Sequence, residues 1–214
     1  AIDRVCREHP GRVGFARGAK EALDISASGR LALLAGLENG YPIGRDLALL
    51  AHFAERGVRY VTLCHTANND LCDSSTDPAG PEHRGLSALG REAVAEMNRL
   101  GLVVDVSHAS DETFWDVLKA SAAPVAATHS SCRALCPHPR NLDDEMIRAL
   151  AAAGGVIQIC ALQEYLVPSD PERARLRDLE TKALDQKYGE WEALSEERKL
   201  EARKAYRAIR ARLA

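Results

Sequence analysis

Two histidines, His108 and His129, lie in the same local pattern: each follows an apolar, β-branched run and a hydroxyl residue. The two stretches read Val-Val-Asp-Val-Ser-His-Ala-Ser and Pro-Val-Ala-Ala-Thr-His-Ser-Ser. Their spacing of 21 residues fits a strand, a crossover helix and the next parallel strand, which would place the imidazoles about 5 Å apart. One metal ion, about 2.0 to 2.1 Å from each nitrogen, could then bind both. For either histidine alone, a hydrogen-bonded structural role is the alternative.

Placing the two histidines side by side requires parallel strands. The chain repeats a sequence pattern that predicts such strands. Five times, a helical run is closed by glycine or proline and is followed by a short apolar run. These runs end near Leu37, Cys64, Val106, Thr128 and Ile159. Glycine is the expected residue just after a helix, and Val/Ile-rich runs are typical of buried parallel strands. Strands alternating with helices predict an α/β fold with a parallel sheet.

Each of the first four predicted strands leads to an ionisable side chain, namely Glu38, His65, His108 and His129. In a (β/α)8 barrel the carboxyl ends of the strands converge on one mouth, whereas an open doubly wound sheet spreads them along a line. We therefore predict a (β/α)8 barrel of the TIM type. It is partial, because the sequence shows five strands where a complete barrel has eight.

Two segments depart from the alternation of strands and helices. Residues 66–85 form a long polar loop at the predicted mouth, where we expect a lid. From residue 170 to 214, 22 of 45 residues are charged, with 12 basic and 10 acidic. Two apolar stripes, one with Leu176 and Leu179 and one with Leu200, predict a hairpin of two helices. We therefore expect a partial barrel over residues 1–168 and a charged helical insertion over residues 169–214, serving as surface structure or as a docking site.

Composition excludes several classes of protein. The net charge of −3 gives no basic field, so we expect no nucleic-acid partner. The apolar stretches are too short to span a bilayer, and nothing at Ala1 resembles a signal peptide. We expect a soluble protein and leave its location, cytoplasm or periplasm, open. Six cysteines in a chain of 214 residues do not make a disulfide scaffold.

Five motifs, in order, resemble the zinc-dependent membrane (renal) dipeptidases, peptidase family M19, and its bacterial members. They are Gly-Leu-Glu-Asn-Gly at Glu38, Tyr-Val-Thr-Leu-Cys-His-Thr-Ala-Asn-Asn at His65, Gly-Leu-Val-Val-Asp-Val-Ser-His-Ala-Ser at His108, Thr-His-Ser-Ser at His129 and Pro-Arg-Asn-Leu-Asp-Asp at Arg140. The resemblance covers residues 30–160, roughly. The charged helices resemble an insertion found in bacterial members.

The resemblance implies a metal-dependent barrel of the amidohydrolase type that binds two zinc ions and hydrolyses dipeptides, including those with a C-terminal D-residue. In it, Glu38 bridges both metals, and His108 and His129 complete the protein ligands of one. A hydroxide held between the zinc ions attacks the peptide carbonyl. His65 contacts the substrate or the tetrahedral intermediate, and Arg140 faces the substrate carboxylate.

The sequence also departs from the family pattern. The family has a His-x-Asp pair on its first strand and an Asp on its last strand, and neither is found here. We therefore expect the chain to cover the middle of the domain, with the other barrel segments supplied by the same longer polypeptide. Separately, we expect the protein to form a homodimer. The alternative is a truncated, non-catalytic barrel fragment that acts as a structural or interaction partner.

Overall fold

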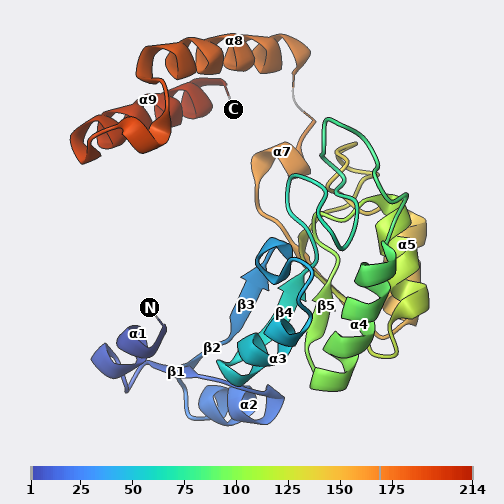
Figure 1. Ribbon diagram of the computed structural model, residues 1–214. Helices are drawn as coiled ribbons and strands as arrows, with labels where there is room; N and C mark the ends of the chain where they lie inside the picture. Colours follow the sequence, from blue (N-terminus) through green and yellow to red (C-terminus); the bar gives the residue numbers. More distant parts are fainter. Residues whose placement is uncertain (1, 169, 214) are drawn as a thin grey trace. The chain divides into compact units, whose positions relative to one another are not determined.

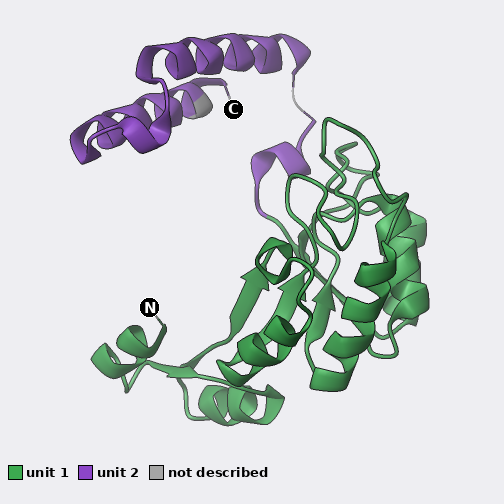
Figure 2. Ribbon diagram, in the orientation of Figure 1, with its two compact units in different colours: residues 1–160 green, residues 161–214 purple. Residues whose placement is uncertain are grey.

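The computed structural model describes residues 2–168 and 170–213, and the chain divides into two compact units. Residues 1–160 form the first unit and residues 161–214 the second (Figure 2). All the predicted site residues belong to the first unit. The predicted extent of the barrel part, residues 1–168, stays a prediction.

Five parallel strands make the main sheet of the first unit, and they are adjacent in the order in which they occur in the sequence. They are β3 (Ala35–Glu38), β4 (Val58–Thr62), β5 (Val103–Asp105), β6 (Ala126–Ser130) and β7 (Val156–Ile159). Sequential order is that of a (β/α)8 barrel, whereas a doubly wound sheet reverses its order partway. The predicted α/β fold with a parallel sheet is confirmed. Over the described residues the sheet is open, as one arc of a barrel would be.

Four helices connect these strands and cover the sheet. They are α3 (Ala48–Glu55), α4 (Ala88–Leu100), α5 (Asp111–Ala120) and α6 (Asp144–Ala152). Figure 1 shows α3, α4 and α5 on the same side of the sheet. Met97 of α4 and Phe114 of α5 are completely buried in a core that also includes Val61 and Val104 of the sheet. Helix α5 is capped by Ser110, a residue type typical of helix starts, whose hydroxyl accepts a hydrogen bond from the Thr113 N–H.

The N-terminal part contains more elements than the sequence predicted. Helix α1 (Ile2–Glu8) is followed by β1 (Val13–Phe15), α2 (Ala19–Ala27) and β2 (Leu31–Leu33), and β1 and β2 form a separate two-stranded parallel sheet. A strand does end near Leu37 as predicted, because β3 ends at Glu38, but the prediction that the whole run forms a single strand is wrong. That run is divided at Leu34 into β2 and β3, which belong to different sheets. A single-turn helix, η1 (Tyr41–Ile43), follows β3.

The polar loop of residues 66–85 is organised around the Asp73 carboxylate. This side chain is 1% exposed and accepts hydrogen bonds from the backbone N–H groups of Glu82, His83 and Gly85, at 2.9 to 3.1 Å. The Asp73 carbonyl accepts a further bond from the Ser110 N–H at the start of α5. The loop is thus fastened to the body of the unit at a buried point.

The second unit is helical. It contains α7 (Gln163–Leu166), α8 (Pro171–Tyr188), the single-turn helix η2 (Trp191–Ala193) and α9 (Glu196–Leu213). Helices α8 and α9 pack on each other through Tyr188, Ala202 and Ile209, which are buried. The predicted stripes are wrong in part, because Leu176, Leu179 and Leu200 are 43%, 55% and 53% exposed. Across residues 2–168 and 170–213, every helix is too short or too polar to cross a bilayer.

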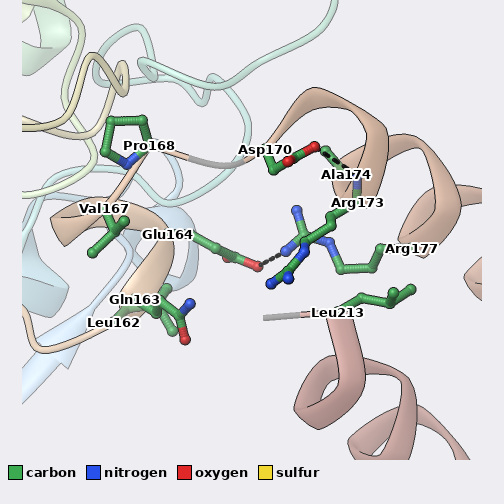
Figure 3. A pocket seen from close by; sticks show the side chains of 10 residues that line it. All are labelled: Leu162, Gln163, Glu164, Val167, Pro168, Asp170, Arg173, Ala174, Arg177 and Leu213. Atoms are coloured by element: carbon green, nitrogen blue, oxygen red, sulfur yellow. Dashed lines mark hydrogen bonds and ion pairs between the residues drawn. The ribbon is translucent and has the colours of Figure 1, made fainter.

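A cavity of about 270 Å³ lies within the second unit, between α7 and the two long helices (Figure 3). Leu162, Val167 and Leu213 supply apolar lining, and Glu164 and Arg177 form an ion pair of 2.8 Å at its wall. None of the predicted site residues lines this cavity. The predicted site residues lie instead in the first unit, near the carboxyl ends of its strands.

Candidate metal centre

Four neighbouring strands carry the ionisable residues that the sequence singled out. Glu38 is the last residue of β3, whereas His65 and His108 each come three residues after the end of β4 and β5. His129 lies within β6, one residue before its end. The expectation that each histidine closes its strand is therefore only approximate. All four nevertheless lie at the carboxyl edge of one sheet.

The side chains of Glu38, His108 and His129 meet at one point. Glu38 Oε1 lies 3.1 Å from His129 Nε2 and 3.4 Å from His108 Nε2, and the two Nε2 atoms are 3.0 Å apart. Ligands placed 2.0 to 2.1 Å from a tetrahedral ion are about 3.3 Å from one another. The three donor atoms therefore have the spacing that a single zinc-sized ion requires.

His65 belongs to the same cluster. Its Nε2 atom lies 3.8 Å from Glu38 Oε1, and its ring is tilted by 33° over that of His108, with 4.1 Å between centroids. The ligand atoms of Glu38, His65 and His108 all lie within 4.8 Å of one another. The His65 side chain is also 43% exposed, so it can reach either a metal ion or a molecule bound at the mouth.

His108 is the most constrained of the histidines. Its backbone has a φ of 72°, in the left-handed region that non-glycine residues rarely adopt, and its side chain is 7% exposed. Burial, followed by the positive charge of Arg140 and the neighbouring His65 and His129, lowers the pKa of His108 to about 3. The imidazole is thus neutral at physiological pH, which is the form that binds a metal.

Arg140 contacts one member of this cluster, His129, and is 4% exposed. Its Nη2 atom donates a hydrogen bond to the His129 carbonyl at 3.2 Å, and its own backbone N–H donates to His138 Nδ1 at 3.1 Å. A guanidinium this close to the imidazoles supplies fixed positive charge at the mouth. The expectation that it faces a substrate carboxylate stays a prediction.

Sequence reasoning missed a buried polar network behind the histidines. Asp105 is fully buried and accepts hydrogen bonds from Thr62, Ser107 and Thr128. Thr128 in turn lies 2.9 Å from His129 Nδ1. The signal was present in the repeated pattern, since a hydroxyl residue precedes each histidine, but nothing in the sequence showed what the hydroxyls contact.

Tyr60 of β4 also lies near the centre. Burial, followed by the negative charges of Asp105 and Glu38, raises the pKa of its phenol. Its ring occupies the space beside Gly36, where an added Cβ would come within 2.0 Å of Tyr60 Cζ. The glycine two residues before Glu38 therefore lets this tyrosine support the end of β3.

A carboxylate and neutral imidazoles form a donor set that suits zinc and its neighbours in the first transition series. The ligand spacing, the neutral state of His108 and the hydrogen bond to His129 Nδ1 all fit a bound divalent ion. The residues present thus match the metal centre that the sequence predicted, while the assignment of each ligand stays a prediction.

Comparison with known proteins gives consistent matches. Residues 1–193 match the profile described as membrane dipeptidase (peptidase family M19). Dipeptidase tcpJ of Claviceps purpurea is 40% identical over 178 residues, which are 83% of this chain and 41% of that protein. Dipeptidase verJ of Clonostachys rogersoniana is also 40% identical, over 82% of this chain and 44% of that protein. The chain thus spans less than half the length of these curated relatives.

Two solved structures resemble the fold. The probable dipeptidase PvdM from Pseudomonas aeruginosa has a TM-score of 0.78 and 31% identity, over 97% of this chain and 56% of that chain. A metallo peptidase from Rhodobacter sphaeroides, liganded with a phosphinate mimic of the dipeptide L-Ala-D-Ala, has a TM-score of 0.71 and 29% identity. That match covers 78% of this chain and 48% of the other.

Proposed function

The chain belongs to the membrane dipeptidase family, peptidase family M19, and we propose that it forms the metal-binding middle part of a zinc-dependent dipeptidase. The observation that carries this proposal is the convergence of Glu38, His108 and His129, whose donor atoms are 3.0 to 3.4 Å apart. The remaining strands of the barrel would come from the same longer polypeptide, since the chain covers 41% to 44% of its curated relatives.

In this proposal Glu38, His108 and His129 would hold one zinc ion, and Glu38 would also serve a second ion whose other ligands would come from the rest of the polypeptide. Bound zinc supplies a Lewis acid that activates the attacking water and polarises the peptide carbonyl. Glu38 also keeps negative charge close to the imidazoles, so that the site as a whole is not strongly cationic. Burial keeps His108 neutral, which is the charge state that can bind a metal.

His65 and Arg140 are the residues that we assign to the substrate. His65 is half-exposed beside the cluster, where its imidazole can contact the reacting carbonyl or the tetrahedral intermediate. Arg140 can bind the terminal carboxylate of a dipeptide through two parallel hydrogen bonds, which a lysine cannot reproduce. The ligand named for the Rhodobacter sphaeroides structure supports dipeptides with a C-terminal D-residue as substrates.

The direct test uses the full polypeptide that carries this chain and two substrates, L-Ala-L-Ala and L-Ala-D-Ala. We expect hydrolysis of both, its loss after zinc is removed with a chelator, and its return when zinc is added. Hydrolysis that survives complete removal of the metal would contradict the proposal. Absence of hydrolysis in the zinc-loaded polypeptide would favour the non-catalytic alternative.

Oligomeric state is a separate part of the proposal. We propose a homodimer of the full polypeptide, because the family resemblance suggests one and most soluble oligomers of identical chains are dimers. Sedimentation equilibrium should give twice the mass of one polypeptide. A single-chain mass over the whole accessible concentration range would exclude it.

A further inference from the structure

We propose that Asp105 is a positioning residue that sets the tautomer of His129 through the Thr128 hydroxyl, so that the Nε2 lone pair of His129 points at Glu38 and His108. The inference rests on the proposed metal centre, because Nε2 is the atom that would bind the ion. Asp105 itself lies behind the centre at the end of β5 and is 0% exposed.

The Asp105 carboxylate accepts hydrogen bonds from four donors, which lie on β4, on β6 and in the segment that follows β5. Its Oδ1 atom accepts from the backbone N–H groups of Ser107 and Thr128 at 2.9 and 3.0 Å. Its Oδ2 atom accepts from the hydroxyls of Thr62 and Thr128, both at 2.6 Å. A carboxylate has about four lone-pair sites, so each finds a partner here.

The position of one hydrogen follows from this arrangement. A threonine hydroxyl has a single hydrogen, and Thr128 donates it to Asp105. The same Oγ1 atom lies 2.9 Å from His129 Nδ1, so in that contact it must accept. The hydrogen of neutral His129 is therefore on Nδ1, and its Nε2 carries the lone pair.

On the opposite side of the ring the contact with His108 fits this tautomer, whereas Glu38 Oε1, 3.1 Å from the same Nε2, would by itself favour a hydrogen there until an ion is bound. His129 Nε2 lies 3.0 Å from His108 Nε2, a distance at which only one of the two nitrogens can carry a hydrogen in the metal-free protein. Because His129 Nε2 has none, His108 supplies it. His108 Nδ1 is then a bare lone pair, and it has no hydrogen-bond partner among the described residues.

Ser107 fixes His129 from the side of β5. Its Oγ atom accepts a hydrogen bond from the His129 backbone N–H at 3.0 Å and lies 3.4 Å from Thr128 Oγ1. The Ser107 hydroxyl hydrogen can therefore be donated to the remaining lone pair of Thr128 Oγ1. The ring of His129 is thereby fixed in orientation as well as in tautomer.

Asp105→Asn should reverse the direction of the hydrogen bond between Asp105 and the Thr128 hydroxyl and of the one between that hydroxyl and His129 Nδ1. The carbonyl of the new amide must face the two backbone N–H groups, because its NH2 group would clash with those donors. The NH2 group must then face the hydroxyls of Thr62 and Thr128, and both must accept from it. The Thr128 hydroxyl is left to donate to His129 Nδ1, which moves the histidine hydrogen to Nε2.

The experiment reads the tautomer directly in the metal-free full polypeptide. Histidines labelled with 15N are observed by NMR at about pH 8.5, two units above an ordinary histidine pKa, and His129 is assigned by the signal lost in His129→Gln. We expect the Nδ1–H form in the parent and in Thr128→Ser, the Nε2–H form in Asp105→Asn, and no single form in Thr128→Val. If the folded Asp105→Asn and Thr128→Val proteins both keep the parent tautomer, the proposal is wrong.

Zinc affinity supplies the second measurement, by competition with a chromogenic chelator. Loss of a partner of a ligating histidine typically weakens a metal site about 10- to 100-fold. We expect a loss of that size in Asp105→Asn and Thr128→Val, and near-parent affinity in Thr128→Ser. Weaker zinc binding with an unchanged tautomer would mean that Asp105 only holds the strands together. Since neither measurement uses substrate, the inference can fail while dipeptidase activity is present, or hold while it is absent.

Discussion

At the scale of single residues, His108 shows how the fold presents one of the proposed metal ligands. Its left-handed backbone, with φ at 72°, costs about 1 to 2 kcal/mol for an L-residue. The strain turns the chain after β5, so that the imidazole comes within 5.0 Å of the His129 ring, centroid to centroid. Strained residues of this kind are typical of functional sites.

His108→Ala should abolish tight zinc binding while the circular dichroism spectrum of the full polypeptide stays that of the parent. One of three ligands is lost, and no helix or strand contains this residue. His52→Ala, on the exposed face of α3, is the matched control and should keep its zinc. Elemental analysis gives the stoichiometry, and full zinc content in His108→Ala would contradict the ligand assignment.

His108→Gly tests the strain separately from the metal. Glycine adopts the left-handed region without cost, so the metal-free His108→Gly protein should be about 1 kcal/mol more stable than His108→Ala. Urea unfolding of the two metal-free variants measures the difference. Equal or lower stability of the glycine variant would show that the local backbone relaxes once the imidazole is removed.

The sequence predicted the convergence of Glu38, His108 and His129 because residues at the carboxyl ends of neighbouring parallel strands lie at the same edge of the sheet. It did not predict the part played by Asp105. Thr128 is 23 residues away along the chain, and only the register that pairs Asp105 with Ala126 brings the two side chains together. The residues around an aspartate near a strand end do not indicate whether its carboxylate is buried, as that of Asp105 is, or solvated.

At the scale of elements, prediction succeeded for helix α5 and for the five strands of the main sheet, and it failed to separate the short strands of the N-terminal part. The helix starting at Ser110 has a cap and ten residues of helical pattern. Strands β1 and β2 have three residues each, too few for a period to be recognised. The break at Leu34 was hidden because the apolar run continues through it into β3.

Gly36→Ala should destabilise the protein by about 1 to 3 kcal/mol, the usual cost of overpacking. The added methyl group would lie 2.0 Å from Tyr60 Cζ, so the ring or β3 must shift. Gly11→Ala is the control, because a Cβ added at that residue would meet nothing within 4 Å and its φ is not positive. Urea unfolding measures both, and Tyr60→Leu should recover part of the loss in the Gly36→Ala background.

Asp73→Asn should loosen the loop of residues 66–85, at a cost of about 2 kcal/mol near neutral pH. Burial alone would raise the pKa of this carboxyl, but the backbone N–H groups of His83, Gly85 and Glu82 lower it below its ordinary value. A lowered pKa stabilises the fold above the unfolded-state pKa of about 4, and that contribution is lost as pH falls through the folded-state pKa.

The difference in unfolding free energy between the parent and Asp73→Asn should therefore be constant above about pH 5 and shrink below about pH 4. Asp70→Asn is the control, since its exposed ion pair with Arg45, at 3.4 Å, contributes little. A difference for Asp73→Asn that stays constant down to the acid transition would exclude this role of the carboxylate.

At the scale of the whole molecule, the main sheet has the open edges of an incomplete barrel. In the described part of the chain, β3 and β7 each have a strand on one side only. Val156 and Ile159 of β7 are 55% and 58% exposed, and an exposed apolar edge favours association. The proposed metal centre would be incomplete in the same way, since no His-x-Asp pair occurs in the 214 residues to serve a second ion.

Residues 1–214 alone should therefore bind at most about one zinc ion tightly and show no dipeptidase activity above background. An ion bound by Glu38, His108 and His129, as proposed, would find all three protein ligands here, whereas a second ion would have only the shared Glu38. A single carboxylate binds zinc weakly, and loss of the second ion removes several kcal/mol of stabilisation from the transition state. Elemental analysis after dialysis and an assay with L-Ala-D-Ala measure both quantities. Two retained zinc ions, or turnover by this chain alone, would show that the missing ligands are present within it.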